Sequence, residues 1–273
     1  MNLKEALKDK LTEKELKNFV KSFDIIGDIA ILEIPKELEK KEKEIAEVVV
    51  KIHPRIKTVC KKSGERFGEF RLRKMKILFG KETETIHKEY GCKFKLDVTK
   101  VYFSPRESTE RQRIAEQIKP KEKILVMFAG IGPYAIIIAK KQPEAKVYAI
   151  EINPDAYNYM VENIKLNKVE YQVIPILGDV NKECPKYFNF FDRIVMPMPK
   201  GAYEFLSLAI KCLKSKGIIH FYYWGGEDAF QKAEELIKNE CKKLGKKYKI
   251  LNKRKVLPYG PRTYKICIDF QVN

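Results

Sequence analysis

The chain has 273 residues, 44% of them hydrophobic and 34% charged, so it can bury a core and form one large domain or a large and a small one. No apolar stretch approaches the roughly 18–20 residues of a membrane span, and the amphipathic, acid-containing start is unlike a signal or transit peptide. We therefore expect a soluble, cytoplasmic protein, whose formal net charge of +18 favours a polyanionic partner such as nucleic acid, although a lysine-rich proteome would give the same excess.

The first hundred residues mix short strands with a helix. Residues 22–34 (SFDIIGDIAILEI) predict two strands joined at Gly27-Asp28, and residues 35–53 have helical spacing of apolar side chains. Residues 68–80 (GEFRLRKMKILFG) then alternate apolar and basic side chains, as a strand with one cationic face does. We interpret residues 1–100 as a small α+β domain that contacts RNA.

From Ser104 onward, strands and helices alternate, which predicts an open, mainly parallel sheet over residues 101–273. The last two segments, residues 247–260 and 264–272, predict an antiparallel pair at one edge of that sheet. The expected strands are residues 123–128, 146–152, 172–177, 192–196 and 217–223, and the expected helices are residues 132–141, 155–167, 202–214 and 228–245.

Ligands bind such sheets at the carboxyl ends of the strands, and three candidate groups lie at those ends. Gly130 and Gly132 follow the first strand and let a ligand approach the backbone. Glu151 ends the second strand, where a carboxylate can accept from both ribose hydroxyls of a nucleoside, and Asp179 ends the third, near an adenine amino group. The alternatives are a plain glycine turn, an acid favoured by a helix dipole and a turn aspartate.

The fourth strand ends at Pro197-Met198-Pro199, where a sheet ladder cannot continue because proline lacks a backbone donor. The 6 cysteines and 3 histidines are dispersed and no CxxC pair occurs, so we expect no metal and reduced thiols in the core.

The run from Gly64 to Asp179 resembles the archaeal and eukaryotic tRNA (guanine-37) methyltransferases. The matching segments are VYFSPRESTERQR (101–113), MFAGIGPYAI (127–136), VYAIEINPDAY (147–157), ENIKLNKV (162–169) and PILGDV (175–180), and FDIIGDIAILEIP (23–35) resembles the start of that family's second domain. The resemblance implies a class I Rossmann-like fold, S-adenosylmethionine as cofactor, and tRNA as partner through its anticodon arm, tRNA-Phe in particular.

The resemblance also assigns site residues. Glu110 corresponds to the family's general base, Arg71 to the arginine that stabilises charge on the guanine oxygen, and Pro199 to a residue that shapes the pocket; Arg73 remains an alternative to Arg71. The implied cofactor contacts are Arg111, Phe128, Gly130, Gly132, Glu151, Ile152, Asp179, Val180 and Pro197. Without the resemblance, Glu110 would be interpreted as part of a helix ion pair with Arg106 or Arg113, in a helix that Ser104-Pro105 opens with a capping box at Glu107.

Three departures from the family pattern are visible. The chain begins almost at the second domain, the usual Asp before MFAG is Val126, and the asparagine of the NLPK motif is Pro197. A less polar wall suits a tricyclic base, so we expect methylation of guanosine 37 at ring nitrogen 1, of 4-demethylwyosine at carbon 7, or of both. The alternatives are an aminocarboxypropyl transferase, against which SPRESTER argues, an NAD-dependent oxidoreductase suggested by GxGxxA, and an inactive tRNA-binding protein.

Overall fold

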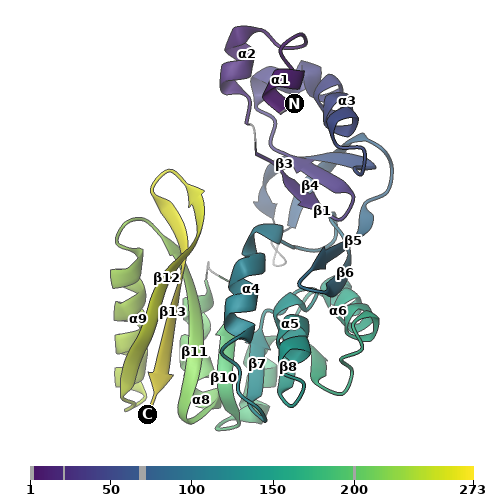
Figure 1. Ribbon diagram of the computed structural model, residues 1–273. Coiled ribbons are helices and arrows are strands. Elements are labelled where there is room, and N and C mark those ends of the chain that lie inside the picture. The colour runs from purple at the N-terminus through teal and green to yellow at the C-terminus, as the bar shows by residue number, and fades with distance from the viewer. Residues whose placement is uncertain (1–2, 21, 68–71, 199–200) are drawn as a thin grey trace. The chain divides into compact units, whose positions relative to one another are not determined.

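The computed structural model describes residues 3–20, 22–67, 72–198 and 201–273, in which no helix has the length and apolar character needed to cross a bilayer. The chain folds as two compact units, Met1–Pro105 and Arg106–Asn273 (Figure 1). Each unit has its own apolar core.

The small unit is built on a four-stranded sheet of order β1-β2-β3-β4. The predicted hairpin is confirmed: β1 (Asp24–Ile26) and β2 (Ile29–Leu32) are antiparallel, and Gly27 turns between them at φ 58°. The predicted helix is also confirmed, as a 3-10 turn (Lys36–Lys41) followed by α3 (Glu42–Ile52). The remaining elements are α1 (Leu3–Ala6), α2 (Glu13–Asn18), β3 (Thr58–Phe67), β4 (Leu72–Phe79) and the separate hairpin of β5 (Glu84–Glu89) and β6 (Cys92–Asp97).

The large unit contains a seven-stranded sheet of order β12-β13-β11-β10-β7-β8-β9. Five strands are parallel, and β13 and β12 add antiparallel to β11 at one edge, as predicted. The chain runs from β7 outward in both directions, so the carboxyl end of β7 is the switch point at which such sheets bind ligands. The strands are β7 (Lys123–Met127), β8 (Lys146–Glu151), β9 (Val173–Leu177), β10 (Phe191–Met196), β11 (Leu213–Gly225), β12 (Tyr248–Gly260) and β13 (Thr263–Val272).

Helices cover both faces of this sheet (Figure 1). They are α4 (Ser108–Ala115), α5 (Pro133–Lys141), α6 (Pro154–Leu166), α7 (Val180–Glu183), α8 (Leu206–Cys212) and α9 (Ala229–Lys243), with 3-10 turns at Pro105–Glu107, Cys184–Tyr187 and Ala202–Phe205. The cysteines are free thiols and all six are buried, as the prediction of reduced core thiols requires.

The two faces of β11 and β13 differ in chemistry because side chains alternate along a strand. On β13, Ile266, Ile268 and Phe270 join the apolar cluster that includes residues of α8 and α9. The intervening residues, Lys265 and Asp269 among them, are buried polar groups that bond to side chains near α4. This polar face contacts α4, the helix that carries Glu110.

Candidate functional site

Residues from four segments meet at the carboxyl ends of β7, β8, β9 and β10, which are neighbours in the sheet. Backbone hydrogen bonds hold the loops there: Ala129 N donates to Ile150 O at 2.9 Å, and Gly178 N donates to Glu151 O at 2.9 Å. The residues brought to this edge are Phe128, Gly130 and Gly132 after β7, Glu151 and Ile152 after β8, Asp179 and Val180 after β9, and Pro197 after β10. The structure thus gathers the cofactor residues that the sequence predicted for the strand ends.

The loop after β7 has an unusual backbone. Phe128, Gly130 and Gly132 have φ values of 58°, 58° and 86°, all in the left-handed region. Gly132 also leaves no space for a side chain, since an added Cβ would lie 2.9 Å from Met160 Cγ. A non-glycine residue in this region costs free energy and is found disproportionately at functional sites, so the strain at Phe128 points to this loop as a binding element.

Glu151 ties the second strand to the glycine loop. Its Oε2 accepts from Gly130 N at 2.6 Å, its Oε1 accepts from Asn153 N at 2.8 Å, and the residue is 9% exposed. Each oxygen keeps a lone pair, so the carboxylate can still accept from the two hydroxyls of a ribose. Burial raises the pKa of Glu151 above its usual value, against the backbone donors that lower it.

Asp179 has a local structural role. It is the N-cap of α7, with Oδ1 accepting from Asn181 N at 2.9 Å, and its side chain is half-buried. Val180 is buried beside it, and Ile152 is half-buried at the adjacent strand end. The cap uses one lone pair of one oxygen, so the rest of the carboxylate remains able to accept from an adenine amino group. Adenine contact therefore stays a prediction for these residues.

Glu110 lies on α4, is 3% exposed and is held by strong donors. Arg113 binds it through two nitrogens, with Nη2 at 2.6 Å from Oε1 and Nε at 2.8 Å from Oε2. The hydroxyl of Tyr222 donates to Oε1 at 2.7 Å. Oε1 has two donors, whereas Oε2 has one, with Arg254 Nε 3.7 Å away in an ion pair, so Oε2 is the oxygen that keeps a lone pair for a proton. The structure thus contains the helix ion pair and leaves one position open for a base.

The helical segment opens at Pro105, as predicted, because a 3-10 turn (Pro105–Glu107) leads directly into α4, and the capping box between Ser104 and Glu107 stays a prediction. α4 itself begins at Ser108, and its N-cap residue Glu107 makes no side-chain cap hydrogen bond. The carboxylate of Glu107 accepts from Lys265 Nζ at 2.7 Å, and the same ammonium donates to Pro197 O at 3.0 Å. This buried ion pair fixes the end of β10 at the first proline of the sequence motif.

The remaining predicted residues either lie outside the described residues or are buried in the large unit. Arg71 and Pro199 lie outside the described residues, as does the side chain of Arg73. Arg111 is 2% exposed, and its charge acts on the hydroxyl of Tyr134, whose pKa is raised chiefly by burial. Val126, where the family has Asp, is fully buried within β7 between Val195 and Ala149, so this departure is an ordinary core residue.

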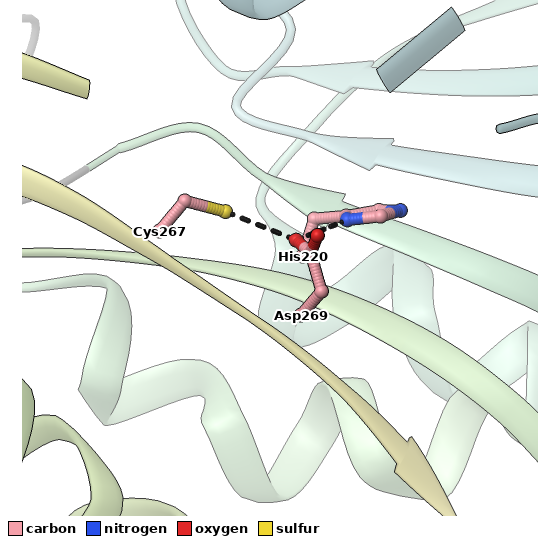
Figure 2. A group of neighbouring side chains, drawn as sticks. All are labelled: His220, Cys267 and Asp269. Carbon is pink, nitrogen blue, oxygen red and sulfur yellow. Dashed lines mark hydrogen bonds and ion pairs between the residues drawn. The ribbon is translucent and has the colours of Figure 1, made fainter. Parts of the chain in front are cut away.

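The sequence analysis missed a group of buried polar residues on β11 and β13. His220 Nδ1 bonds Asp269 Oδ1 at 2.6 Å, and Cys267 Sγ lies 3.3 Å from the same oxygen (Figure 2). The available signal was the alternation in IIHFYYW and YKICIDF, where every second residue is polar or aromatic among apolar neighbours.

Both parts of the chain match known family models. Residues 85–251 match the TRM5/TYW2 methyltransferase domain, and residues 3–83 match the TYW2 N-terminal domain. Among curated relatives, the tRNA (guanine(37)-N(1))-methyltransferase Trm5b of Pyrococcus abyssi is 46% identical over 95% of this chain and 78% of its own length. The tRNA(Phe) (4-demethylwyosine(37)-C(7)) aminocarboxypropyltransferase of Methanocaldococcus jannaschii is 40% identical over 89% of this chain and 95% of its own length. The tRNA (guanine(37)-N(1))/4-demethylwyosine(37)-methyltransferase Taw22 of Nanoarchaeum equitans is 36% identical over 79% and 88%.

Solved structures of the same family also superpose on this chain. Trm5b of Pyrococcus abyssi superposes with a TM-score of 0.88 at 46% identity, covering 96% of this chain and 78% of that one. The complex of aTrm5 and tRNALeu gives 0.90 at 38% identity over 100% and 78%, and Pyrococcus horikoshii TYW2 in complex with MeSAdo gives 0.83 at 35% over 99% and 97%. The predicted class I Rossmann-like methyltransferase fold is thereby confirmed, and the chain belongs to the TRM5/TYW2 methyltransferase family.

Proposed function

We propose that this chain uses S-adenosylmethionine to methylate the nucleoside at position 37 of tRNA, with tRNA-Phe as the substrate tRNA. The acceptor atom is ring nitrogen 1 of guanosine, carbon 7 of 4-demethylwyosine, or each of them. The observation that carries the proposal is the 2.6 Å hydrogen bond from Gly130 N to Glu151 Oε2 at the switch point of the sheet. It places a carboxylate with free lone pairs beside a strained glycine loop, which suits the ribose of a nucleoside cofactor.

The residues at the strand ends fit S-adenosylmethionine. Glu151 would hold the ribose, Asp179 and Val180 the adenine, and Phe128 and Pro197 would border the sulfonium. Relatives support this choice, because the M. jannaschii TYW2 structure contains AdoMet and the P. horikoshii one contains MeSAdo. When bound, the cofactor supplies an electrophilic methyl group; the residues of this chain must orient the acceptor base and accept its proton.

Glu110 is proposed as the proton acceptor. Ring nitrogen 1 of guanosine carries a proton at neutral pH, and carbon 7 of the tricycle carries a hydrogen that must also leave, so either reaction needs a base. Oε2 of Glu110 keeps a lone pair for the proton, and the guanidinium of Arg113 holds the carboxylate through both of its oxygens. Arg71 is proposed to stabilise charge on the exocyclic oxygen and Pro199 to shape the pocket.

The basic β12–β13 hairpin is proposed as part of the tRNA-binding surface. Most side chains of residues 251–262 are exposed, and this segment carries several cations. Tyr259 is half-exposed and packs at 5.2 Å against Trp224, which offers an aromatic surface next to phosphate-binding lysines. The small unit, with its own excess of lysines, is proposed to bind the anticodon arm.

Transfer of the aminocarboxypropyl group is the second candidate. Residues 3–83 match the TYW2 N-terminal domain, and relatives named for that reaction align over nearly their whole length. Both reactions start from the same sulfonium and differ in the carbon that is attacked. Methyl transfer is favoured because Trm5b is the more similar relative at 46% identity and because the chain carries SPRESTER. An NAD-dependent reaction finds no support in these relatives.

The test is mass spectrometry of nucleoside 37 after incubation with S-adenosylmethionine and tRNA-Phe carrying either guanosine or 4-demethylwyosine. A methyl increment on either substrate supports the proposal, whereas an aminocarboxypropyl increment establishes the second candidate. tRNA binding without modification would mean an inactive RNA-binding protein. Glu110→Gln should lower the rate at which the increment forms by about 10²- to 10⁴-fold, and Glu116→Gln, which changes an exposed carboxylate at the end of the same helix, should leave that rate intact.

A further inference from the structure

Arg113 stands between two buried carboxylates. On one side it binds Glu110 through Nε and Nη2, at 2.8 and 2.6 Å. On the other side it binds Asp269, with Nη1 at 2.5 Å from Oδ2 and Nη2 at 3.2 Å from Oδ1. Because a guanidinium is planar and rigid, a carboxylate that fixes one side of it also fixes the orientation of the group on the other side.

Asp269 is itself held from the opposite side. His220 Nδ1 lies 2.6 Å from Asp269 Oδ1, and His220 Nε2 lies 2.9 Å from Arg193 Nη1. An arginine can only donate, so Nε2 must accept and the proton of the imidazole is on Nδ1, from which it donates to Asp269. His220 is therefore neutral, in agreement with a pKa lowered by burial and by the neighbouring arginines.

The series ends in a second ion pair. Arg193 binds Glu122 through Nε at 2.9 Å and Nη2 at 3.1 Å, and Glu122 lies just before β7. From Glu110 to Glu122 the charged groups thus alternate in sign, with the neutral imidazole of His220 between Asp269 and Arg193. All but Arg113 and Glu122 are nearly inaccessible, so the chain of contacts is rigid and screened little by salt.

A metal site is the obvious alternative for His220, Cys267 and Asp269, whose ligand atoms lie within 4.8 Å of one another (Figure 2). Two of these three potential ligands already accept hydrogen bonds: Asp269 accepts from Arg113, and His220 Nε2 accepts from Arg193. Because two guanidinium cations are in hydrogen-bond contact with this group, they would repel a metal cation there. Burial and the nearby carboxylates raise the pKa of Cys267 well above its usual value, so its sulfur is a thiol and a poor ligand.

We propose that Asp269, backed by His220 and Arg193, is a positioning residue that sets the orientation of Glu110 for proton removal through Arg113. The proposal rests on the proposed function, in which Glu110 takes the proton of the acceptor base. With Asp269 in place, Arg113 is fixed from both sides and holds both oxygens of Glu110 in one orientation. Without it, the guanidinium can rotate and turn the Glu110 carboxylate with it.

The test is the single-turnover rate of methyl transfer by Asp269→Asn in the full chain, with enzyme and S-adenosylmethionine in excess over tRNA. The rate constant should fall about 10- to 100-fold, the size expected when a catalytic group is displaced by a fraction of an ångström to an ångström. The Kd for S-adenosylhomocysteine and the KM for tRNA should not change. Asp192→Asn is the matched control, because Asp192 is a half-buried, ion-paired aspartate of β10 at the opposite end of the sheet.

A double-mutant comparison separates positioning from a general defect. If Asp269 acts through Glu110, adding Asp269→Asn to Glu110→Gln should lower the residual rate little further, since the group it orients is already gone. Should Asp269→Asn fail to fold, Arg113→Lys replaces it, because lysine keeps the charge but cannot bind both carboxylates in one plane. It should give the same fall in rate.

The outcomes distinguish this inference from the proposed function. If the unaltered protein transfers no methyl group, the proposed function is wrong. If it is active, Glu110→Gln is strongly slowed, and Asp269→Asn or its substitute keeps the full rate, only the positioning role is overturned. A fall in rate that is additive with Glu110→Gln, or that follows weaker cofactor binding, overturns it equally.

Discussion

Replacing Lys265 by methionine tests whether the end of β10 is held by a buried ion pair. The Lys265 and Glu107 side chains are 4% and 8% exposed, and their Nζ–Oε2 distance is 2.7 Å. Lys265→Met leaves the Glu107 carboxylate buried without a counter-charge. Breaking a buried pair from one side costs about 3–5 kcal/mol, whereas replacing both partners is often close to neutral. We therefore expect Lys265→Met to lower the free energy of unfolding by about 3–5 kcal/mol and Glu107→Gln/Lys265→Met to recover most of that loss.

The assay is urea unfolding followed by the fluorescence of Trp224, the only tryptophan, which is the β11 partner of Lys265 in the sheet. Lys253→Met on β12 is the matched control: its ion pair with Glu234 is 44% and 32% exposed, so its loss should cost about 1 kcal/mol or less. The methyl-transfer rate of Lys265→Met should also fall, because Pro197 O loses its donor. Equal costs for the two lysine variants, or a double variant no more stable than Lys265→Met, would refute the reasoning.

Three further predictions concern the cofactor and the RNA. Gly132→Ala should destabilise the fold by about 1–2 kcal/mol and weaken cofactor binding, since its Cβ would contact Met160. Gly245→Ala is the control: it is also at positive φ but has nothing within 4 Å, so unfolding and calorimetric measurements should show the backbone strain without a change in cofactor affinity. Cofactor affinity should decline as pH falls, because only ionised Glu151 accepts from two hydroxyls. Since the pKa of Glu151 is raised, this decline should begin at a higher pH than an exposed glutamate would give, and Glu151→Gln should show no such pH dependence. The affinity for tRNA should fall steeply with salt, by about 10³-fold or more between 50 and 200 mM if six or more phosphates are contacted. Filter binding at constant pH measures this, and an affinity that does not change with salt would contradict the prediction.

The sequence was sufficient to predict the fold and to place the proposed cofactor residues at neighbouring strand ends. Strands such as residues 123–127 and 146–151 are continuous apolar runs, and a parallel order brings their carboxyl ends together whatever the loops do. The hydrogen bond between Gly130 and Glu151 follows from that topology, because each residue directly follows or ends its strand. Local pattern and topology therefore agree on where these residues lie, and their cofactor contacts stay predictions.

The acceptor half could not be predicted in the same way. Arg113 and Asp269 are 156 positions apart, and Glu107 and Lys265 are 158 apart, so no local pattern relates them. Their pairing depends on the register of β13 against β11 and on the position of α4 over that face. The local pattern predicted where the helical segment opens, at Pro105, but not the ion pair that the carboxylate of Glu107 makes with Lys265.

The two halves of the site therefore have different structural origins. The parallel strands β7, β8 and β9 supply the backbone turns and carboxylates proposed to hold the cofactor. The antiparallel strand β13 supplies the anchors on the acceptor side: Lys265 holds Pro197, and Asp269 holds the arginine that binds Glu110. Since Pro197 has no side-chain amide, its place is fixed through its carbonyl, which any residue would present. Substitution at position 197 would thus change the side chain proposed to face the acceptor base while Lys265 keeps the backbone in place, so the same anchored backbone can present a polar or an apolar side chain.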